Sequence, residues 1–166
     1  MEFRCKLSEM VEMVARLRMA IKEPLRAYEV HPTEESLGWG RSMVCEYDYT
    51  IRVPELKIYF RDAVEFEFDE EKQDDVPIEE ITHFYREGKT EPDYGSYYSI
   101  LKLVSWYIED EGLSIAKPEE LECVIDMPYD VNLLDIDDVD WLDVDRKGIR
   151  IVNKLNDILK EDMPNE

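Results

Sequence analysis

The 166-residue chain has few glycines, cysteines and histidines, little positive charge and no long apolar run. Its six glycines form no phosphate-binding loop, because Gly38-Trp39-Gly40 is not followed by the Lys and Ser/Thr that such a loop requires. No serine lies in a nucleophile elbow. No apolar stretch is long enough to cross a membrane, and the N-terminus shows no signal-peptide pattern. These absences predict a cytoplasmic protein without a membrane span.

The cysteines and histidines form no metal or redox motif. Cys5, Cys45 and Cys123 are odd in number and widely spaced, without a CxxC. They predict reduced and mostly buried thiols. His31 and His83 have no cysteine or second histidine at ligand spacing, so we expect both to be surface or packing residues. The sequence predicts no cofactor and no metal.

Acidic residues are what the chain has in excess. The 41 Asp and Glu against 20 Lys and Arg give a formal net charge of −21. Residues 1–60 carry a net charge of −1, residues 61–145 carry −21 and residues 146–166 carry +1. An acidic surface that served only solubility would spread along the chain, whereas this one is confined to the middle. Such a field repels nucleic acid and anionic membranes and attracts basic protein surfaces.

Apolar periodicity predicts a single domain over residues 1–166, with 44% hydrophobic residues available for a core. The expected fold class is α+β, a small antiparallel sheet of about residues 44–68 packed against four to five helices. The residues of this sheet that should face the helices are Tyr47, Tyr49, Ile51, Ile58, Phe66 and Phe68. Helical spacing or helix-boundary residues predict helices at residues 7–22, 78–86, 94–111, 118–124 and 148–164.

The densest acidic segment is Asp135–Asp145, in which Asp alternates with apolar residues. Its best match to a calcium loop begins at Asp143, which places Lys147 and Lys154 at positions where calcium needs oxygen ligands. We therefore expect no calcium site. The interleaved apolar residues predict a fixed ridge whose carboxylates point outward. An acidic loop with a few buried anchors is the alternative.

Aromatic residues close to acidic ones suggest a second part of an interface. Tyr94 and Tyr97 could supply buried contact area while carboxylates steer a partner. Tyr98, Trp106 and Tyr107 are expected to lie mostly in the core. No catalytic or metal-binding residue is assigned. The candidate partner-binding residues are Asp135, Asp137, Asp138, Asp140, Trp141, Asp143, Asp145, Glu65, Glu67, Asp69, Tyr94 and Tyr97.

In charge and size, the chain resembles small acidic bacterial immunity proteins and phage-type DNA mimics. We expect a non-enzymatic inhibitor that occludes a basic, nucleic-acid-handling protein, such as the nuclease toxin of a toxin–antitoxin pair. Its carboxylates would occupy the places of substrate phosphates against Lys and Arg of the partner. The sequence does not specify the partner or the oligomeric state.

Two other classes of function remain open. A metal-dependent hydrolase would use strand carboxylates such as Asp48, Glu55 or Glu65. Asp48 followed by Glu55-Leu56-Lys57 matches the short pattern of restriction-type nucleases, although the negative field would repel a polyanionic substrate. A structural or adaptor subunit would use its acidity only to remain soluble.

Overall fold

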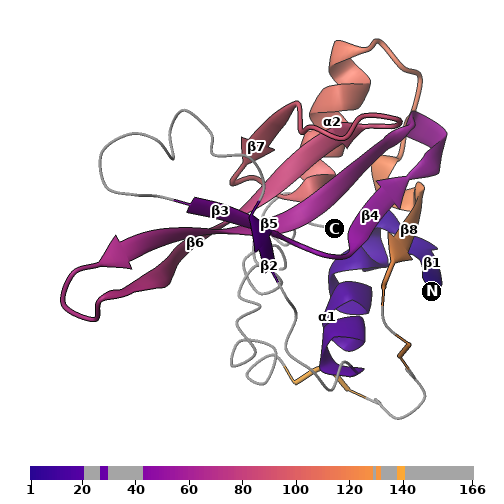
Figure 1. The fold of residues 1–166 in the computed structure, drawn as a ribbon. Helices are drawn as coiled ribbons and strands as arrows, with labels where there is room; N and C mark the ends of the chain where they lie inside the picture. Colours follow the sequence, from indigo (N-terminus) through magenta and orange to yellow (C-terminus); the bar gives the residue numbers. More distant parts are fainter. Residues whose placement is uncertain (21–26, 30–42, 129, 132–137, 141–166) are drawn as a thin grey trace.

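The computed structural model describes residues 1–20, 27–29, 43–128, 130–131 and 138–140 (Figure 1). Its strands are β1 (Glu2–Lys6), β2 (Ala27–Glu29), β3 (Met43–Tyr47), β4 (Thr50–Val53), β5 (Ile58–Asp69), β6 (Asp74–Arg86), β7 (Tyr94–Ser96) and β8 (Glu122–Asp126). The described helices are α1 (Met10–Ala20) and α2 (Ile100–Asp110), with 3₁₀ turns at Leu7–Glu9, Pro54–Leu56 and Pro118–Glu120.

All eight strands belong to one antiparallel sheet. The order β1-β8-β4-β5-β3-β2 forms its main path, and β6 pairs with β5 while β7 pairs with β6. The long strand β5 organises this arrangement, because β4 and β3 pair with successive parts of one edge and β6 pairs along the whole of the other. Strand β8 returns late in the chain and inserts between β1 and β4. The N-terminal strand β1 is therefore an edge strand.

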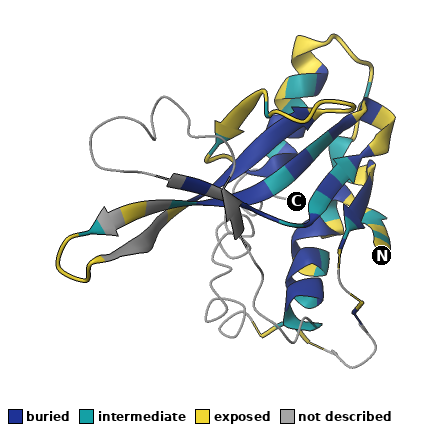
Figure 2. Ribbon diagram, viewed as in Figure 1, coloured by how far each residue is buried: buried dark blue, intermediate teal, exposed yellow. Residues whose placement is uncertain are grey.

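Both helices cover the same face of the sheet. Ile51, Phe60 and Ile125, from β4, β5 and β8, are fully buried. They form one hydrophobic core with Leu17 of α1 and Leu103 of α2. Figure 2 shows that buried residues run along these central strands and continue into α1 and α2. On the opposite face, a separate small cluster joins β3, β5 and β6 and consists of Val44, Ala63 and Ile81.

Local sequence features fix the boundaries of several elements. The Glu9 carboxylate accepts a hydrogen bond from the backbone N–H of Lys6 (3.0 Å), at the turn that leads into α1. The hydroxyl of Ser99 accepts a hydrogen bond from the backbone N–H of Lys102 (3.2 Å) and caps the N-terminus of α2. Lys57 adopts a left-handed conformation (φ 55°) where the chain turns from β4 into β5.

The predicted architecture is wrong in its proportions. The sheet has eight strands rather than a few, and only two α-helices occur among the described residues, rather than four or five. The helix predicted at residues 78–86 is instead part of β6, which is buried on both faces near its end. A strand without an exposed face loses the period-two signal, which explains the error.

Other predicted helices are shorter than expected or absent. The helix predicted at residues 94–111 is confined to α2, because Tyr94–Ser96 pairs with β6 as strand β7. The segment 118–124 forms a 3₁₀ turn and then enters β8. Strand β1 was not predicted. The helix predicted at residues 148–164 lies outside the described residues.

Two parts of the prediction are confirmed. The segment expected to be helical from residue 7 contains the turn Leu7–Glu9 and α1. The segment 44–68 is largely β-structure, although β5 is one continuous strand rather than two short ones. Tyr47, Tyr49, Ile51 and Ile58 are buried in the core that includes the helices. The side chains of Phe66 and Phe68 lie outside the described part of the structure.

Candidate functional site

Residues 65–80, at the far ends of β5 and β6 with the turn between them, form a hairpin that we call the acidic arm. Strand β3 pairs with β5 only as far as Phe66, and β7 pairs with β6 only at residues 82–84. Beyond these points β5 and β6 pair only with each other among the described strands, and Figure 1 shows them projecting from the body of the sheet. The arm contains nine Asp or Glu and one Lys, a net charge of −8.

The sequence shapes the arm at its base and at its tip. The register of β5 against β6 shifts next to Phe66, which lies opposite Pro77. Proline is tolerated within a sheet at such irregularities because it has no N–H to donate. At the tip, Asp69 Oδ1 accepts hydrogen bonds from the backbone N–H groups of Glu71 (2.9 Å) and Lys72 (3.3 Å). The turn is therefore held by the arm's own residues.

Three of the predicted partner-binding residues lie on this arm. Glu65, Glu67 and Asp69 occupy every second position of β5. The Cα atoms of neighbouring residues in this set are therefore about 7 Å apart. Glu65 faces away from the helices, because its neighbour Val64 packs into the helix-covered core. Within the described part of the chain, no Lys or Arg forms an ion pair with any of these three carboxylates.

Two predicted aromatic residues lie in β7 or directly after it, and one of them, Tyr97, reaches the base of the arm. The Tyr97 hydroxyl donates a hydrogen bond to Glu65 Oε2 (3.2 Å), which joins two predicted partner-binding residues from distant parts of the chain. Tyr94 stacks on Phe84 of β6, with ring centroids 5.0 Å apart. Burial and the nearby carboxylates, led by Asp110, raise the pKa of Tyr94. Both tyrosines remain exposed, Tyr94 by 45% and Tyr97 by 50%.

A second aromatic pair is exposed, contrary to the prediction that it belongs to the core. Tyr98 and Trp106 contact each other edge to face, with centroids 4.9 Å apart, and are 50% and 39% exposed. The Lys102 ammonium lies 5.0 Å from the Tyr98 ring and 5.6 Å from the Trp106 ring. Tyr107, also expected in the core, is half-buried. Tyr107 packs against the main core. The prediction was therefore wrong for Tyr98, which precedes α2, and for Trp106, which lies on the exposed side of α2.

The predicted ridge is described only at residues 138–140. Asp138 and Asp140 are exposed, while Val139 is half-buried and packs against the main core. The backbone N–H of Asp140 lies 3.2 Å from the sulfur of Met19 in α1. The ridge as a whole stays a prediction, because five further predicted residues lie outside the described part of the structure: Asp135, Asp137, Trp141, Asp143 and Asp145.

The predicted acidic residues therefore occur in two places rather than on one described surface. Asp140 lies beside α1, which packs on the helix-covered face. Glu65 lies on the opposite face of the sheet and contacts Tyr97. The structure brings together the base of the arm and Tyr97, which directly follows β7.

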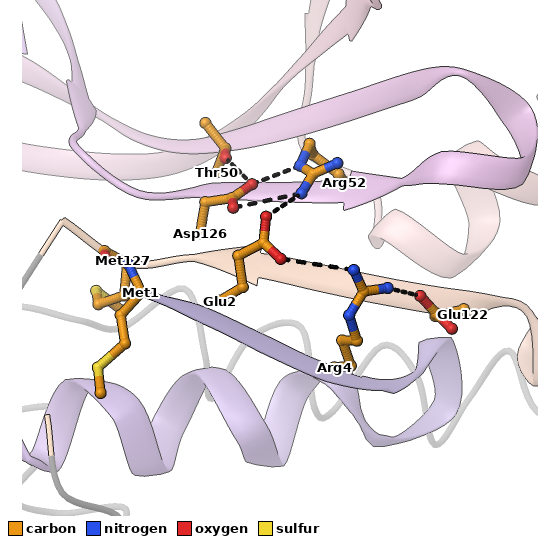
Figure 3. Close-up of polar contacts among 8 residues, drawn as sticks. All are labelled: Met1, Glu2, Arg4, Thr50, Arg52, Glu122, Asp126 and Met127. Carbon is orange, nitrogen blue, oxygen red and sulfur yellow. Dashed lines mark hydrogen bonds and ion pairs between the residues drawn. The ribbon is translucent and has the colours of Figure 1, made fainter.

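Acidic residues at the other end of the sheet are neutralised by arginines (Figure 3). Arg52 Nε donates to Asp126 Oδ2 (2.5 Å), and its Nη2 donates to Glu2 Oε1 (3.0 Å). Arg4 in turn contacts Glu2 (3.5 Å) and Glu122. Two arginines thus balance most of the charge of three carboxylates across β1, β8 and β4.

Two buried polar groups were not predicted, and the first lies in the core. Asp62 Oδ2 accepts hydrogen bonds from the Tyr49 hydroxyl and from Arg18 Nη2 (3.3 Å). The Arg18 guanidinium also lies 4.8 Å from the Tyr49 ring centroid. Asp62 Oδ1 and Arg18 Nε and Nη1 have no hydrogen-bond partner among the described residues. Burial raises the pKa of Asp62 to about 6 and lowers the pKa of Arg18.

The second buried group lies on the opposite face of the sheet. Glu46 Oε2 accepts a hydrogen bond from the Tyr85 hydroxyl and lies 2.8 Å from His83 Nδ1. Burial, and then this bond to Glu46, raise the pKa of Tyr85. A carboxylate that orients a histidine can support general-base catalysis. Here, however, the His83 ring is buried and lies against Gly95 of the neighbouring strand, so the group serves packing.

The carboxylates considered for a hydrolase are not gathered into a metal site. Asp48 precedes β4 and Glu55 follows it, in a 3₁₀ turn rather than in the strand that the sequence predicted. Glu65 lies further along, at the base of the arm. Among the described residues, no group of three or more His, Cys, Asp or Glu could hold a metal ion.

The chain matches no protein-family model, no curated protein and no solved structure. In the part of the chain that the structure describes, no helix is both long and apolar enough to span a membrane. The geometry of the arm and its neighbouring aromatic residues therefore carries the functional argument.

Proposed function

We propose that this protein is a non-enzymatic acidic binding protein that occludes a basic, nucleic-acid-handling protein. The acidic arm supports this proposal most directly, because a net charge of −8 is placed on a projecting hairpin. Such a field accelerates association with a basic partner and makes the association sensitive to salt. Carboxylates on an extended strand could also contact several Lys or Arg residues at once.

The pairing within the arm supports a role other than folding. The register places Glu65 opposite Glu79 and Asp69 opposite Asp74. Like charges directly opposite each other destabilise a pair of strands. The Glu65–Glu79 pair opposes the pairing of the two strands, whereas Asp69 also holds the turn through its bonds to Glu71 and Lys72. The arm therefore keeps acidic residues at a cost in stability, which is typical of a functional surface.

The aromatic residues supply the contact area that charge alone does not provide. Tyr97 is exposed next to the base of the arm and contacts Glu65 directly, while Tyr94 is exposed opposite Phe84 on the helix-covered face. Exposed tyrosine and tryptophan beside carboxylates are characteristic of protein interfaces, in which aromatic groups anchor and charges steer. A basic partner would place its Lys and Arg along the arm and pack against these rings.

The test compares two variants with the same change in charge at different places. The arm variant carries Glu67→Gln, Glu70→Gln and Glu71→Gln. The control variant carries Glu55→Gln, Glu87→Gln and Glu120→Gln, which are exposed and lie outside the arm. Capture from native lysate at low salt identifies a partner, and its affinity for each variant is then measured with purified proteins at low and high salt.

We expect the arm variant to bind at least tenfold more weakly, which corresponds to about 1.4 kcal/mol. The control variant should bind nearly as well as the unmodified protein. Nucleic acid should compete with the protein for the partner, since occlusion requires a shared surface. Equal affinity of both variants, or simultaneous binding of nucleic acid, would refute the proposal. Salt-independent binding would favour the adaptor alternative.

The ridge requires its own variant, with Asp137, Asp138, Asp140 and Asp143 replaced by Asn. If the ridge contributes, this variant should also lose at least tenfold in affinity without melting at a lower temperature. If only the arm variant loses affinity, the interface is restricted to the arm and its neighbouring aromatic residues.

A further inference from the structure

Two cysteines lie directly opposite each other on neighbouring strands of the sheet. Cys5 of β1 lies directly opposite Cys123 of β8 in the antiparallel register. The backbone bonds from Leu7 N to Leu121 O and from Met127 N to Met1 O identify the alternate pairs that exchange hydrogen bonds. By this alternation, the two cysteines are also a hydrogen-bonded pair, for which the Cα–Cα distance is about 5.5 Å. A disulfide requires a Cα–Cα distance of about 4.4–6.8 Å, which this pair meets. It also requires a Cβ–Cβ distance of about 3.5–4.5 Å, which is shorter than the usual side-chain spacing of a hydrogen-bonded pair, so the edge strand β1 must move slightly toward β8 when the bond forms.

The surroundings of the two thiols differ in a way that assigns their roles. Cys123 is fully buried, whereas Cys5 is half-buried at the edge of the sheet. The side-chain hydrogen bond with Cys123 lowers the pKa of Cys5. The same bond, together with burial, raises the pKa of Cys123. The more accessible sulfur, that of Cys5, is therefore also the one that forms a thiolate more readily, and the buried Cys123 thiol lies next to it.

We propose that Cys5 and Cys123 form an oxidisable dithiol, which hydrogen peroxide converts into a disulfide that fastens the edge strand β1 to β8. Both cysteines are free thiols in the structure. The inference is independent of the proposed partner.

The reaction balances with peroxide as the oxidant. The Cys5 thiolate attacks one oxygen of hydrogen peroxide, the O–O bond breaks, and Cys5 becomes a sulfenic acid as hydroxide leaves. The Cys123 sulfur then attacks the Cys5 sulfur, the S–O bond breaks, and water is released. In total, two thiols and one peroxide give one disulfide and two waters. The two sulfurs supply the two electrons that reduce the peroxide.

The position of the pair gives the bond a structural consequence. Strand β1 is at the edge of the sheet and pairs only with β8 among the described strands. A bond from Cys5 to Cys123 would close a loop of more than 100 residues that contains most of the sheet. Cross-links that close long loops restrict the unfolded chain most strongly. Oxidation should therefore stabilise the domain as a whole.

The test treats the full chain with hydrogen peroxide and maps its thiols by mass spectrometry without reduction. Cys5→Ser and Cys123→Ser serve as matched variants that cannot form the bond, and Cys45→Ser should retain it. We expect loss of two of the three thiols, one cross-linked peptide containing residues 5 and 123, and recovery of both thiols with dithiothreitol. The melting temperature of the unmodified protein should rise by several degrees on oxidation.

Three results would overturn the proposal: irreversible oxidation of Cys5 without a cross-link, a disulfide that involves Cys45, or a Cys5–Cys123 bond that lowers the melting temperature. Peptide mapping of the unmodified protein decides the first two even if a serine variant fails to fold. Melting of that same protein before and after oxidation decides the third.

Discussion

Replacing Asp62 with Asn should remove the contribution of this carboxyl group to the dependence of stability on pH. Asp62 is fully buried beside Arg18, and one of its oxygens has no hydrogen-bond donor among the described residues. The contact with Arg18 is a single bond of 3.3 Å rather than a two-bond fork. Burial therefore outweighs the attraction, and the pKa of Asp62 rises from 3.8 to about 6. Asn keeps the size of the side chain but cannot ionise.

The magnitude follows from the difference between the folded and unfolded pKa values. Between pH 4 and 6 the folded state binds more protons at Asp62 than the unfolded state does, so the free energy of unfolding falls as pH rises. The full contribution is present below the unfolded pKa and is lost as pH rises through the folded pKa. The shift of about two units corresponds to about 3 kcal/mol, of which about 2–3 kcal/mol lies between pH 4 and 7.

Urea unfolding at pH 4, 5, 6 and 7, followed by circular dichroism, measures this contribution. The stability of the Asp62→Asn variant should improve by about 2–3 kcal/mol relative to the unmodified protein as pH rises from 4 to 7. In thermal melts this is about 5–10 °C for a chain of this size. Glu67→Gln, an exposed isosteric change on the arm, controls for the loss of one surface charge. Parallel curves for Asp62→Asn and the unmodified protein, or a relative loss for the variant, would refute the reasoning.

Four further changes test other contacts by thermal or urea unfolding. Gly95→Ala should cost about 1 kcal/mol, because its Cβ would lie 3.1 Å from His83 Cδ2, and no loss would contradict the close packing. Ser99→Ala should cost about 0.5–2 kcal/mol by removing the cap of α2, and an unchanged melting temperature would show that the cap is dispensable. Glu79→Lys should stabilise the arm by up to about 1 kcal/mol, because it converts the like-charge pair with Glu65 into an opposite-charge pair. The absence of any gain would show that the arm does not pair in this register. Millimolar calcium should raise the melting temperature no more than a general ionic effect does, because lysines occupy two ligand positions of the best-matching loop, and a saturable rise of several degrees would contradict this.

The sequence predicts best those strands that have one face buried and the other exposed to solvent. In β4, Ile51 and Val53 are buried while Thr50 and Arg52 are half-exposed, so period two is visible in the sequence. Strand β6 differs, because residues on both of its faces are buried. Phe84 packs with the helices, while Tyr85 points to the other face. Apolar residues on both faces can imitate helical spacing, and Pro77, a residue type that often begins a helix, lies here at a register shift of the sheet.

The two buried polar groups left a signal in the sequence that could have been used. Arg18 follows Val14 by four residues and therefore lies on the apolar stripe of α1, where a charge is unexpected. Asp62 likewise occupies an inward position between Phe60 and Val64. A cation and an anion that each interrupt an apolar face are candidates for a buried pair. Their pairing itself depends on how α1 lies on β5, which the sequence does not specify.

For the candidate surface, composition predicted the concentration of acidic residues but not how they are arranged in space. The acidic run around residues 65–75 is visible in the sequence, and so is its proximity to a turn. That it projects as an arm depends on β3 and β7 ending their pairing before β5 and β6 do. The contact between Tyr97 and Glu65 depends on β7 pairing with β6, which was missed because these residues were assigned to a helix.

The distribution of charge separates folding from function better than its total does. Where carboxylates lie on the β1–β8–β4 part of the sheet, arginines from neighbouring strands pair with them. On the arm, the register instead sets acid opposite acid, although a single Lys or Arg at either position would relieve the repulsion. The same chain thus pairs its charges in one region and leaves repulsion in another. Solubility alone gives no reason to set acid opposite acid in a strand pair, whereas the proposed basic partner would relieve that repulsion on binding.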